Sequence, residues 1–207
     1  MSEYIITIGR QYGSCGYDVG KLLAEKRGYD LYDKNLIKMA AQKIGLSEDA
    51  LSKVDEHATN SLLYSIAVEY LTFHNPVNKI NIPVNDKLYF AQVDLIKEIA
   101  EKENGAVIVG RCADNILADN KRVIKVFIVS DLENRVSLIS NSCNLEYSKA
   151  RDIVIKTDKK RANYYNYYTG EKWGKSDNYD LVISTDRIGV SGAVDLINDY
   201  IDHIKNT

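Results

Sequence analysis

The feature that most constrains the fold of this chain is a regular alternation between short apolar runs and longer amphipathic segments. The apolar runs predicted as strands are residues 4–8, 29–33, 105–110, 123–129 and 179–185. Each run is followed by a segment whose pattern is typical of a helix. Because helical crossovers join parallel strands, the alternation predicts an α/β fold with a parallel sheet covered by helices on both faces.

The segments predicted as helices are residues 17–27, 34–44, 47–57, 61–73, 86–103, 132–141, 146–168 and 189–204. Gly28 and Gly45 mark the ends of the first two helices. Residues 74–85 contain both prolines of the chain and are predicted to form a loop. The chain is predicted to be a single domain, with a core of residues 1–33 and 105–207 and a helical subdomain of about residues 34–104.

Charge and composition argue against several classes of protein. The formal net charge of -2 does not suit broad, non-specific binding of nucleic acid, so no such partner is expected. No apolar run approaches the ~20 residues that span a bilayer, and the residues after Met1 lack the pattern of a signal peptide. The three cysteines and three histidines are scattered, without metal-ligand spacing. This use of cysteine favours a reducing, cytoplasmic location.

The segment "ITIGRQYGSCG", residues 6–16, joins a predicted strand to a predicted helix through a glycine-rich turn. The glycines of this turn are Gly9, Gly13 and Gly16. Backbone N–H groups in such a turn, together with the start of the next helix, can hold an anion. Arg10 adds a positive charge, and Ser14 adds a hydroxyl group. The alternative is a tight strand–helix turn that binds no ligand.

A second segment, "VIVGRCADNIL", places Arg111 directly after a predicted buried strand. Ligands of open parallel sheets bind at the carboxyl ends of the strands, and an arginine fork matches the oxygens of a phosphate. Asp114 follows one helical turn later. The alternative is that Arg111 simply pairs with a local acid.

The predicted helix 146–168 carries a basic run, Lys159, Lys160 and Arg161, preceded by Asp158 and followed by several tyrosines. A charged stretch of this kind is also typical of a solvated helix face. The tyrosines could belong to the core, to an interface, or to a surface that stacks on bases.

These segments occur in the same order in a known family. The chain resembles the cytidylate kinase-like proteins, relatives of bacterial cytidylate kinase among the P-loop nucleoside monophosphate kinases. The segments that carry the resemblance are "ITIGRQYGSCG", "YDKNLI", "VIVGRCADNIL" and "DKKRANYYNYYTGEKWG". The resemblance implies a three-layer P-loop NTPase-type fold with a parallel sheet, a helical acceptor-binding subdomain and a basic lid at about residues 158–176.

The activity implied by the resemblance is transfer of the γ-phosphoryl group of ATP, with Mg²⁺, to a nucleoside monophosphate such as CMP or dCMP. It assigns donor-phosphate binding to Gly9, Arg10, Gly13, Ser14, Cys15, Gly16 and Tyr17. It assigns acceptor binding to Asp33, Lys34, Lys38, Arg111 and Asp114. The implied catalytic residues are Arg10, Lys160 and Arg161, and the implied lid cations are Lys159, Lys160 and Arg161. The acids that could hold magnesium are Asp18 and Asp114. The expected partners are small-molecule nucleotides.

The glycine loop departs from the pattern of active kinases in two respects. Gly16 stands where the loop lysine belongs, and Tyr17 or Asp18 stands where a magnesium-binding hydroxyl belongs. Loss of such a cation should cost several kcal/mol of transition-state stabilisation unless another group replaces it, and Arg10 is the candidate replacement. Two hypotheses therefore follow: a phosphotransferase, or a non-catalytic nucleotide-binding regulatory protein. An RNA-binding module that uses the basic, tyrosine-rich helix is a distant third.

Overall fold

The computed structural model describes residues 3–45, 84–102 and 104–205. The predicted helices 47–57 and 61–73 lie outside these residues, as does the predicted loop 74–85 except for its last two residues, which begin helix α5 (Val84–Glu101). The chain divides into two compact units, residues 1–33 with 96–207 and residues 34–95.

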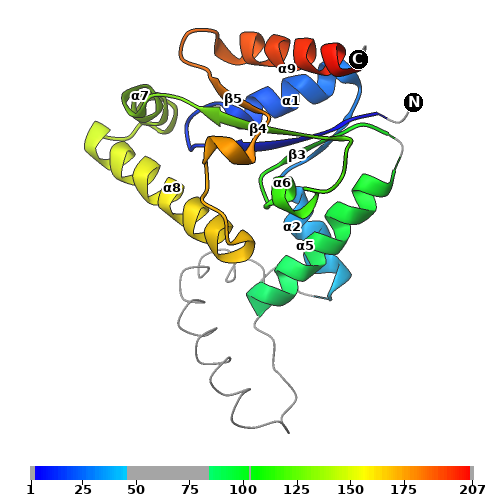
Figure 1. Cartoon of the computed structure of the whole chain (residues 1–207). Coiled ribbons are helices and arrows are strands. Elements are labelled where there is room, and N and C mark those ends of the chain that lie inside the picture. Colours follow the sequence, from blue (N-terminus) through cyan, green and yellow to red (C-terminus); the bar gives the residue numbers. More distant parts are fainter. Residues whose placement is uncertain (1–2, 46–83, 103, 206–207) are drawn as a thin grey trace, which may run out of the picture. The chain divides into compact units, whose positions relative to one another are not determined.

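The larger unit is built on a five-stranded sheet with the strand order β2-β3-β1-β4-β5 (Figure 1). The strands are β1 (Ile5–Arg10), β2 (Asp30–Tyr32), β3 (Ala106–Val109), β4 (Val123–Val129) and β5 (Leu181–Ser184). All neighbouring strands are parallel, so the predicted α/β fold with one parallel sheet is confirmed. Strand β1 lies at the centre because its isoleucines are apolar on both faces and are buried from water.

The helices of the larger unit follow the strands, as the alternation predicts. They are α1 (Gly16–Arg27), α6 (Ala113–Ile116), α7 (Leu132–Cys143), α8 (Tyr147–Thr169) and α9 (Gly189–Lys205), with a short 3-10 turn at Ser176–Asn178. Helix α1 ends at Gly28, whose φ of 67° is the left-handed conformation that glycine adopts readily. Among the described helices, none is both long and apolar enough to cross a membrane.

One face of the sheet is covered by α1 and α9 (Figure 1). The main core lies between these helices and the side chains of β1, β3 and β4, with Leu23 and Ile197 fully buried on the two helices. Since side chains alternate along a strand, Phe127 points to the opposite face from its buried neighbours Val126 and Ile128.

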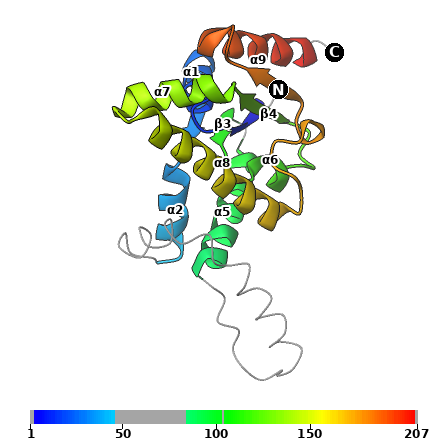
Figure 2. The same cartoon turned by 90° about the vertical axis from the view of Figure 1, so that its left-hand side faces the viewer.

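Helices α7 and α8 pack side by side in both ribbon views (Figure 2). Their shared cluster contains Val136, Ile139, Ala150 and Val154, and the side chain of Tyr12 packs against it. This contact brings the helix pair directly to the segment that follows β1.

The smaller unit, residues 34–95, contains α2 (Asn35–Lys43) and most of α5. Its described core joins Ile37, Ala40 and Ala41 of α2 to Leu88 and Ala91 of α5. Because the unit ends inside α5, the predicted domain boundary at residue 104 stays a prediction.

Candidate functional site

The carboxyl edge of the sheet brings Arg10 and Arg111 together, because β1 and β3 are parallel neighbours. The side chain of Arg10 runs between Gly16 and Gly110. A Cβ atom on Gly16 would overlap Cβ and Cγ of Arg10, and a Cβ atom on Gly110 would overlap the Arg10 guanidinium. No side chain fits at position 16 while Arg10 lies there. The glycine at the lysine position is therefore a packing consequence of Arg10.

The guanidinium groups of Arg10, Arg111 and Arg161, called here the arginine cluster, lie close enough to influence one another. Burial lowers the pKa of Arg10 to about 9, helped by the charges of Arg161 and Arg111 and opposed by Asp33. Burial also lowers the pKa of Arg161. The charge of Arg111 lowers this pKa further, and the charge of Asp158 raises it. In addition, Arg161 donates a hydrogen bond to the carbonyl oxygen of Arg10 at 3.1 Å. Cations crowded in this way favour the binding of an anion.

Arg111 does not take its charge partner from Asp114, although the sequence allowed that alternative. The carboxylate of Asp114 accepts a hydrogen bond from the hydroxyl of Tyr165 at 2.8 Å, and both side chains are buried. Burial raises the pKa of Asp114, and the bond from Tyr165 opposes that rise. Asp114 thus ties α6 to α8.

Several backbone N–H groups of the loop after β1 have no acceptor among the described residues. They belong to Gly13, Cys15, Gly16 and Tyr17. The first bond of α1 runs from the N–H of Val19 to the carbonyl of Cys15, so the earlier N–H groups of the helix have no internal partner. Gly13 and Cys15 have φ angles of 80° and 59°. Successive donors in such a turn form a concave anion site.

The hydroxyl of Ser14 is directed into the protein. It is fully buried and donates to the carbonyl oxygens of Gln11 at 2.9 Å and Ile128 at 3.2 Å. The hydroxyl of Thr185 donates in turn to the carbonyl of Ser14 at 3.1 Å. The Ser14 side chain therefore fastens the loop to β4, and the Ser14 carbonyl fastens it to the end of β5.

Gly9 has a packing role. A Cβ atom at this position would lie 2.6 Å from Cδ2 of Phe127. The ring of Phe127 also contacts those of Trp173 and Tyr179, with centroid distances of 5.3 Å and 4.8 Å. Gly9 thus makes room for an aromatic cluster that anchors the segment following α8.

Of the predicted catalytic residues, the structure brings Arg10 and Arg161 together. Lys159 and Lys160 are exposed on α8, whereas Arg161 is half-buried against the loop. Helix α8 ends at Gly170, which has a φ of 70°. Movement of the predicted lid, residues 158–176, stays a prediction.

Two residues that sequence reasoning did not assign to the loop also contact it. Asp158 accepts the backbone N–H of Tyr12 at 2.7 Å, and Arg135 donates to the carbonyl of Tyr12 at 3.1 Å. The only sequence signal was an acid within the basic run and an arginine in the helix after β4.

Among the other predicted residues, Asp33 is buried and its charge acts on Arg10. Lys34 and Lys38 are both exposed. Lys34 directly precedes α2, and Lys38 lies within it. Asp18 is exposed in the first turn of α1. Within the described part of the chain, no group of three or more His, Cys, Asp or Glu residues could hold a metal by itself.

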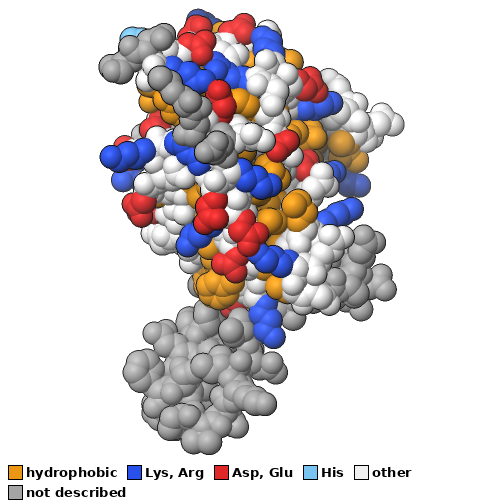
Figure 3. All heavy atoms as spheres, turned by 90° about the vertical axis from the view of Figure 1, so that its right-hand side faces the viewer, with side chains coloured by type: hydrophobic (Ala, Val, Ile, Leu, Met, Phe, Trp, Pro, Cys, Tyr) orange, Lys and Arg blue, Asp and Glu red, His pale blue; other side chains and the backbone are white. Residues whose placement is uncertain are grey.

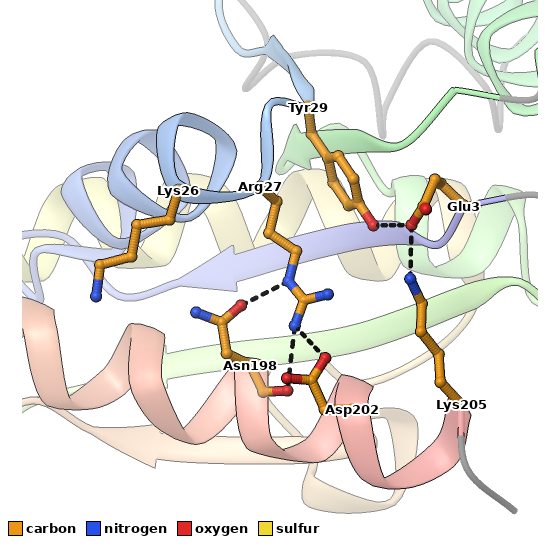
Figure 4. Close-up of a pocket in the computed structure, with 7 residues that line it drawn as sticks. All are labelled: Glu3, Lys26, Arg27, Tyr29, Asn198, Asp202 and Lys205. Atoms are coloured by element: carbon orange, nitrogen blue, oxygen red, sulfur yellow. Dashed lines mark hydrogen bonds and ion pairs between the residues drawn. The ribbon is translucent and has the colours of Figure 1, made fainter.

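The cavity drawn in Figure 4 lies at the opposite, amino-terminal edge of the sheet, since Glu3 and Tyr29 directly precede strands. Its volume is about 480 Å³. Arg27 in this cavity bonds to Asn198 and Asp202 of α9, and Lys205 bonds to Glu3. Because these polar groups satisfy one another, the cavity has no free charge to offer a ligand.

The face drawn in Figure 3 carries Lys and Arg side chains interspersed with Asp and Glu. A basic stripe of the kind that binds nucleic acid is not visible on that face.

Comparison with known proteins agrees with this architecture. A model of the cytidylate kinase-like family matches residues 5–187, and none of the curated proteins compared matches. An uncharacterized protein from Eubacterium ventriosum is 30% identical, with a TM-score of 0.70 over 97% of this chain and 99% of that one. Shikimate kinase from Bacteroides thetaiotaomicron is 14% identical, with a TM-score of 0.53 over 96% and 98% of the two chains. A gluconokinase from Sinorhizobium meliloti is 11% identical, with a TM-score of 0.51 over 98% and 95%.

Proposed function

Because the chain belongs to the cytidylate kinase-like family, we propose that it is an ATP-dependent phosphotransferase whose acceptor is a nucleoside monophosphate of the CMP or dCMP type. Family membership and the P-loop kinase fold support a nucleotide-dependent phosphotransferase in general. The observation that carries the proposal further is the path of Arg10 past Gly16. It supplies a cation to the loop in which the usual lysine is absent.

The loop would hold the donor phosphates through its unpaired N–H groups, and Arg10 would add the charge. Arg161, which bonds to the Arg10 carbonyl, would neutralise negative charge on the transferring phosphoryl group. Arg111 would bind the acceptor phosphate from the neighbouring strand end. Protein catalysis of phosphoryl transfer consists largely of such positioning and charge neutralisation.

Magnesium binding requires only one or two carboxylates when phosphate oxygens and water supply the other ligands. Asp18 fits this requirement, because it is exposed in the first turn of α1, directly after the loop. Asp114 fits less well, because its carboxylate is buried and bonded to Tyr165. The ion would supply further neutralisation of the phosphate charge.

The remaining acceptor and lid assignments follow from the resemblance. Asp33, Lys34 and Lys38 would contribute to the acceptor site, and Lys159 and Lys160 would approach the phosphates when residues 158–176 close. Gly170 and Gly174 have φ angles of 70° and 71°, which suit a hinge.

The test is a measurement of turnover. The protein is incubated with Mg²⁺, ATP and each nucleoside monophosphate in turn, and the diphosphate formed is measured by chromatography. We expect CMP or dCMP to be phosphorylated, and Arg10→Met to lower kcat/KM by about 10²–10³-fold, as loss of other preorganised donors does. Arg151→Met is the control, since Arg151 is exposed on the same helix as Arg161 and pairs with Glu133.

The non-catalytic alternative predicts a different result. Saturable binding of ATP without phosphoryl transfer to any nucleoside monophosphate would contradict the proposed activity and favour a regulatory nucleotide-binding protein. The alternative is supported by the absence of a lysine at position 16.

A further inference from the structure

Both backbone polar groups of Tyr12 are bonded to one ion pair, the N–H in the peptide group shared with Gln11 and the C=O in the peptide group shared with Gly13. Asp158 of α8 accepts the N–H of Tyr12 through Oδ1 at 2.7 Å, and Arg135 of α7 donates to the carbonyl oxygen of Tyr12 at 3.1 Å. The two side chains also bond to each other at 2.6 Å, and Nε of Arg135 donates to the carbonyl of Ser130 at 2.9 Å. Neither peptide group that flanks Tyr12 can rotate unless these bonds break. The Arg135–Asp158 pair is called the clasp below.

The clasp is shielded from solvent. The side chains of Arg135 and Asp158 are only 7% and 17% exposed. Salt screens such a pair weakly, and removing one partner leaves the other charge without compensation. The backbone of α7 also lies against the loop, because a Cβ atom on Gly13 would lie 3.1 Å from the carbonyl oxygen of Arg135. Helix α7 and the loop are therefore in direct contact at residue 13.

The position of the clasp links it to the arginine cluster. Arg161 lies one helical turn beyond Asp158 on α8, bonds to the Arg10 carbonyl and stands 5.4 Å from the centre of the Tyr12 ring. The unpaired N–H groups begin at Gly13, whose N–H belongs to the same peptide group as the Tyr12 carbonyl that Arg135 bonds. The clasp therefore holds the first of the loop donors, and it lies one helical turn from Arg161.

We infer that Asp158, held by Arg135, is a positioning residue that prepares the loop to bind a polyphosphate anion. The inference rests on the proposed function only in that the loop holds phosphate. A donor array that is already oriented binds an anion without a further cost of reorganisation. Two other roles make different predictions. If the Asp158 carboxylate only competed with the ligand, Asp158→Asn would bind pyrophosphate more tightly. If the pair were purely structural, the folded variants would bind pyrophosphate with unchanged affinity.

The experiment is calorimetric titration of the full chain with inorganic pyrophosphate. The variants are Asp158→Asn, Arg135→Gln and the double variant. Asp152→Asn is the matched control, because Asp152 lies on the same helix and forms an exposed pair with Lys156. Each clasp variant should bind pyrophosphate at least tenfold more weakly, which is about 1.4 kcal/mol. The double variant should lose no more affinity than the single variant that binds more weakly, because the two side chains pair with each other and hold the backbone of the same residue.

Unchanged affinity in folded clasp variants, or tighter binding by Asp158→Asn, overturns the inference. If a variant does not fold, the wild-type chain provides a second measurement by amide hydrogen exchange. The Tyr12 N–H should be protected without ligand, and those of Gly13 and Gly16 should become protected only with pyrophosphate. A Tyr12 N–H that exchanges freely until pyrophosphate is added overturns the clasp.

The outcome for the proposed function is separate. A wild-type chain that binds pyrophosphate through an intact clasp but transfers no phosphoryl group contradicts the proposed activity and still supports the clasp. A wild-type chain that binds neither pyrophosphate nor ATP overturns both.

Discussion

Replacing Arg10 with methionine should make the ligand-free protein more stable while removing its response to phosphate. The charged guanidinium of Arg10 is largely desolvated and faces Arg111 and Arg161. A methionine keeps an unbranched apolar stem beside Gly16 but carries no charge. The packing of the apolar stem beside Gly16 is therefore retained, and the buried charge that faces Arg111 and Arg161 is removed.

The magnitude follows from the pKa of Arg10. Its fall from 12.5 to about 9 corresponds to at most about 5 kcal/mol of unfavourable free energy in the charged form. Because the side chain keeps some contact with solvent, we expect the substitution to recover about 1–2 kcal/mol. The pKa is lower in the folded state, so this cost is fully present below pH 9 and is relieved only as the pH rises above 9.

Urea unfolding followed by circular dichroism at pH 7.5, in a buffer without phosphate or sulfate, measures the effect. Arg10→Met should unfold at a higher urea concentration than the wild type. Pyrophosphate at about 100 times its dissociation constant should add about 2.7 kcal/mol to the wild type and nothing to the variant, so their order reverses. Arg151→Met is again the control. A ligand-free variant that is less stable than the wild type would refute the reasoning, because Arg10 would then be stabilising the fold.

Further predictions concern the contacts around the loop. Tyr165→Phe removes a donor to buried Asp114 and should cost about 1–3 kcal/mol at pH 7. The loss raises the folded-state pKa of Asp114 still further, so the cost measured by urea unfolding should become smaller as the pH falls and Asp114 gains its proton; a cost that does not change with pH would contradict this. Gly9→Ala places a methyl group against Phe127 and should cost about 1–3 kcal/mol, part of which Phe127→Leu in the same chain should restore. Trp173 emission should change saturably when ATP and CMP bind together, since its ring packs on Phe127 at the end of the predicted lid. No change at concentrations that calorimetry shows to be saturating would rule out closure of that segment.

The sequence by itself predicted the five strands and the long helices of the larger unit in their order, but not the short helix α6 or the 3-10 turn at Ser176–Asn178. Strand β4 occupies the predicted range 123–129, and α1 ends at Gly28 as its glycine signal indicates. These features depend on local patterns: apolar runs, helical spacing and glycine at positive φ. The ordered motifs also identified the family, which the match over residues 5–187 confirms.

The tertiary structure alone decided which polar groups meet. Asp114 was predicted to act on an acceptor or a metal, yet its buried carboxylate bonds to Tyr165, a residue of the basic helix. The clasp joins residues 12, 135 and 158, whose pairing no local pattern encodes. Likewise, Gly16 reads in the sequence as a lost lysine, whereas the structure shows that Arg10 occupies its space. The physical reason is that hydrophobic periodicity fixes where an element begins and which face it buries, but polar contacts between distant segments depend on how the crossover helices return to the sheet.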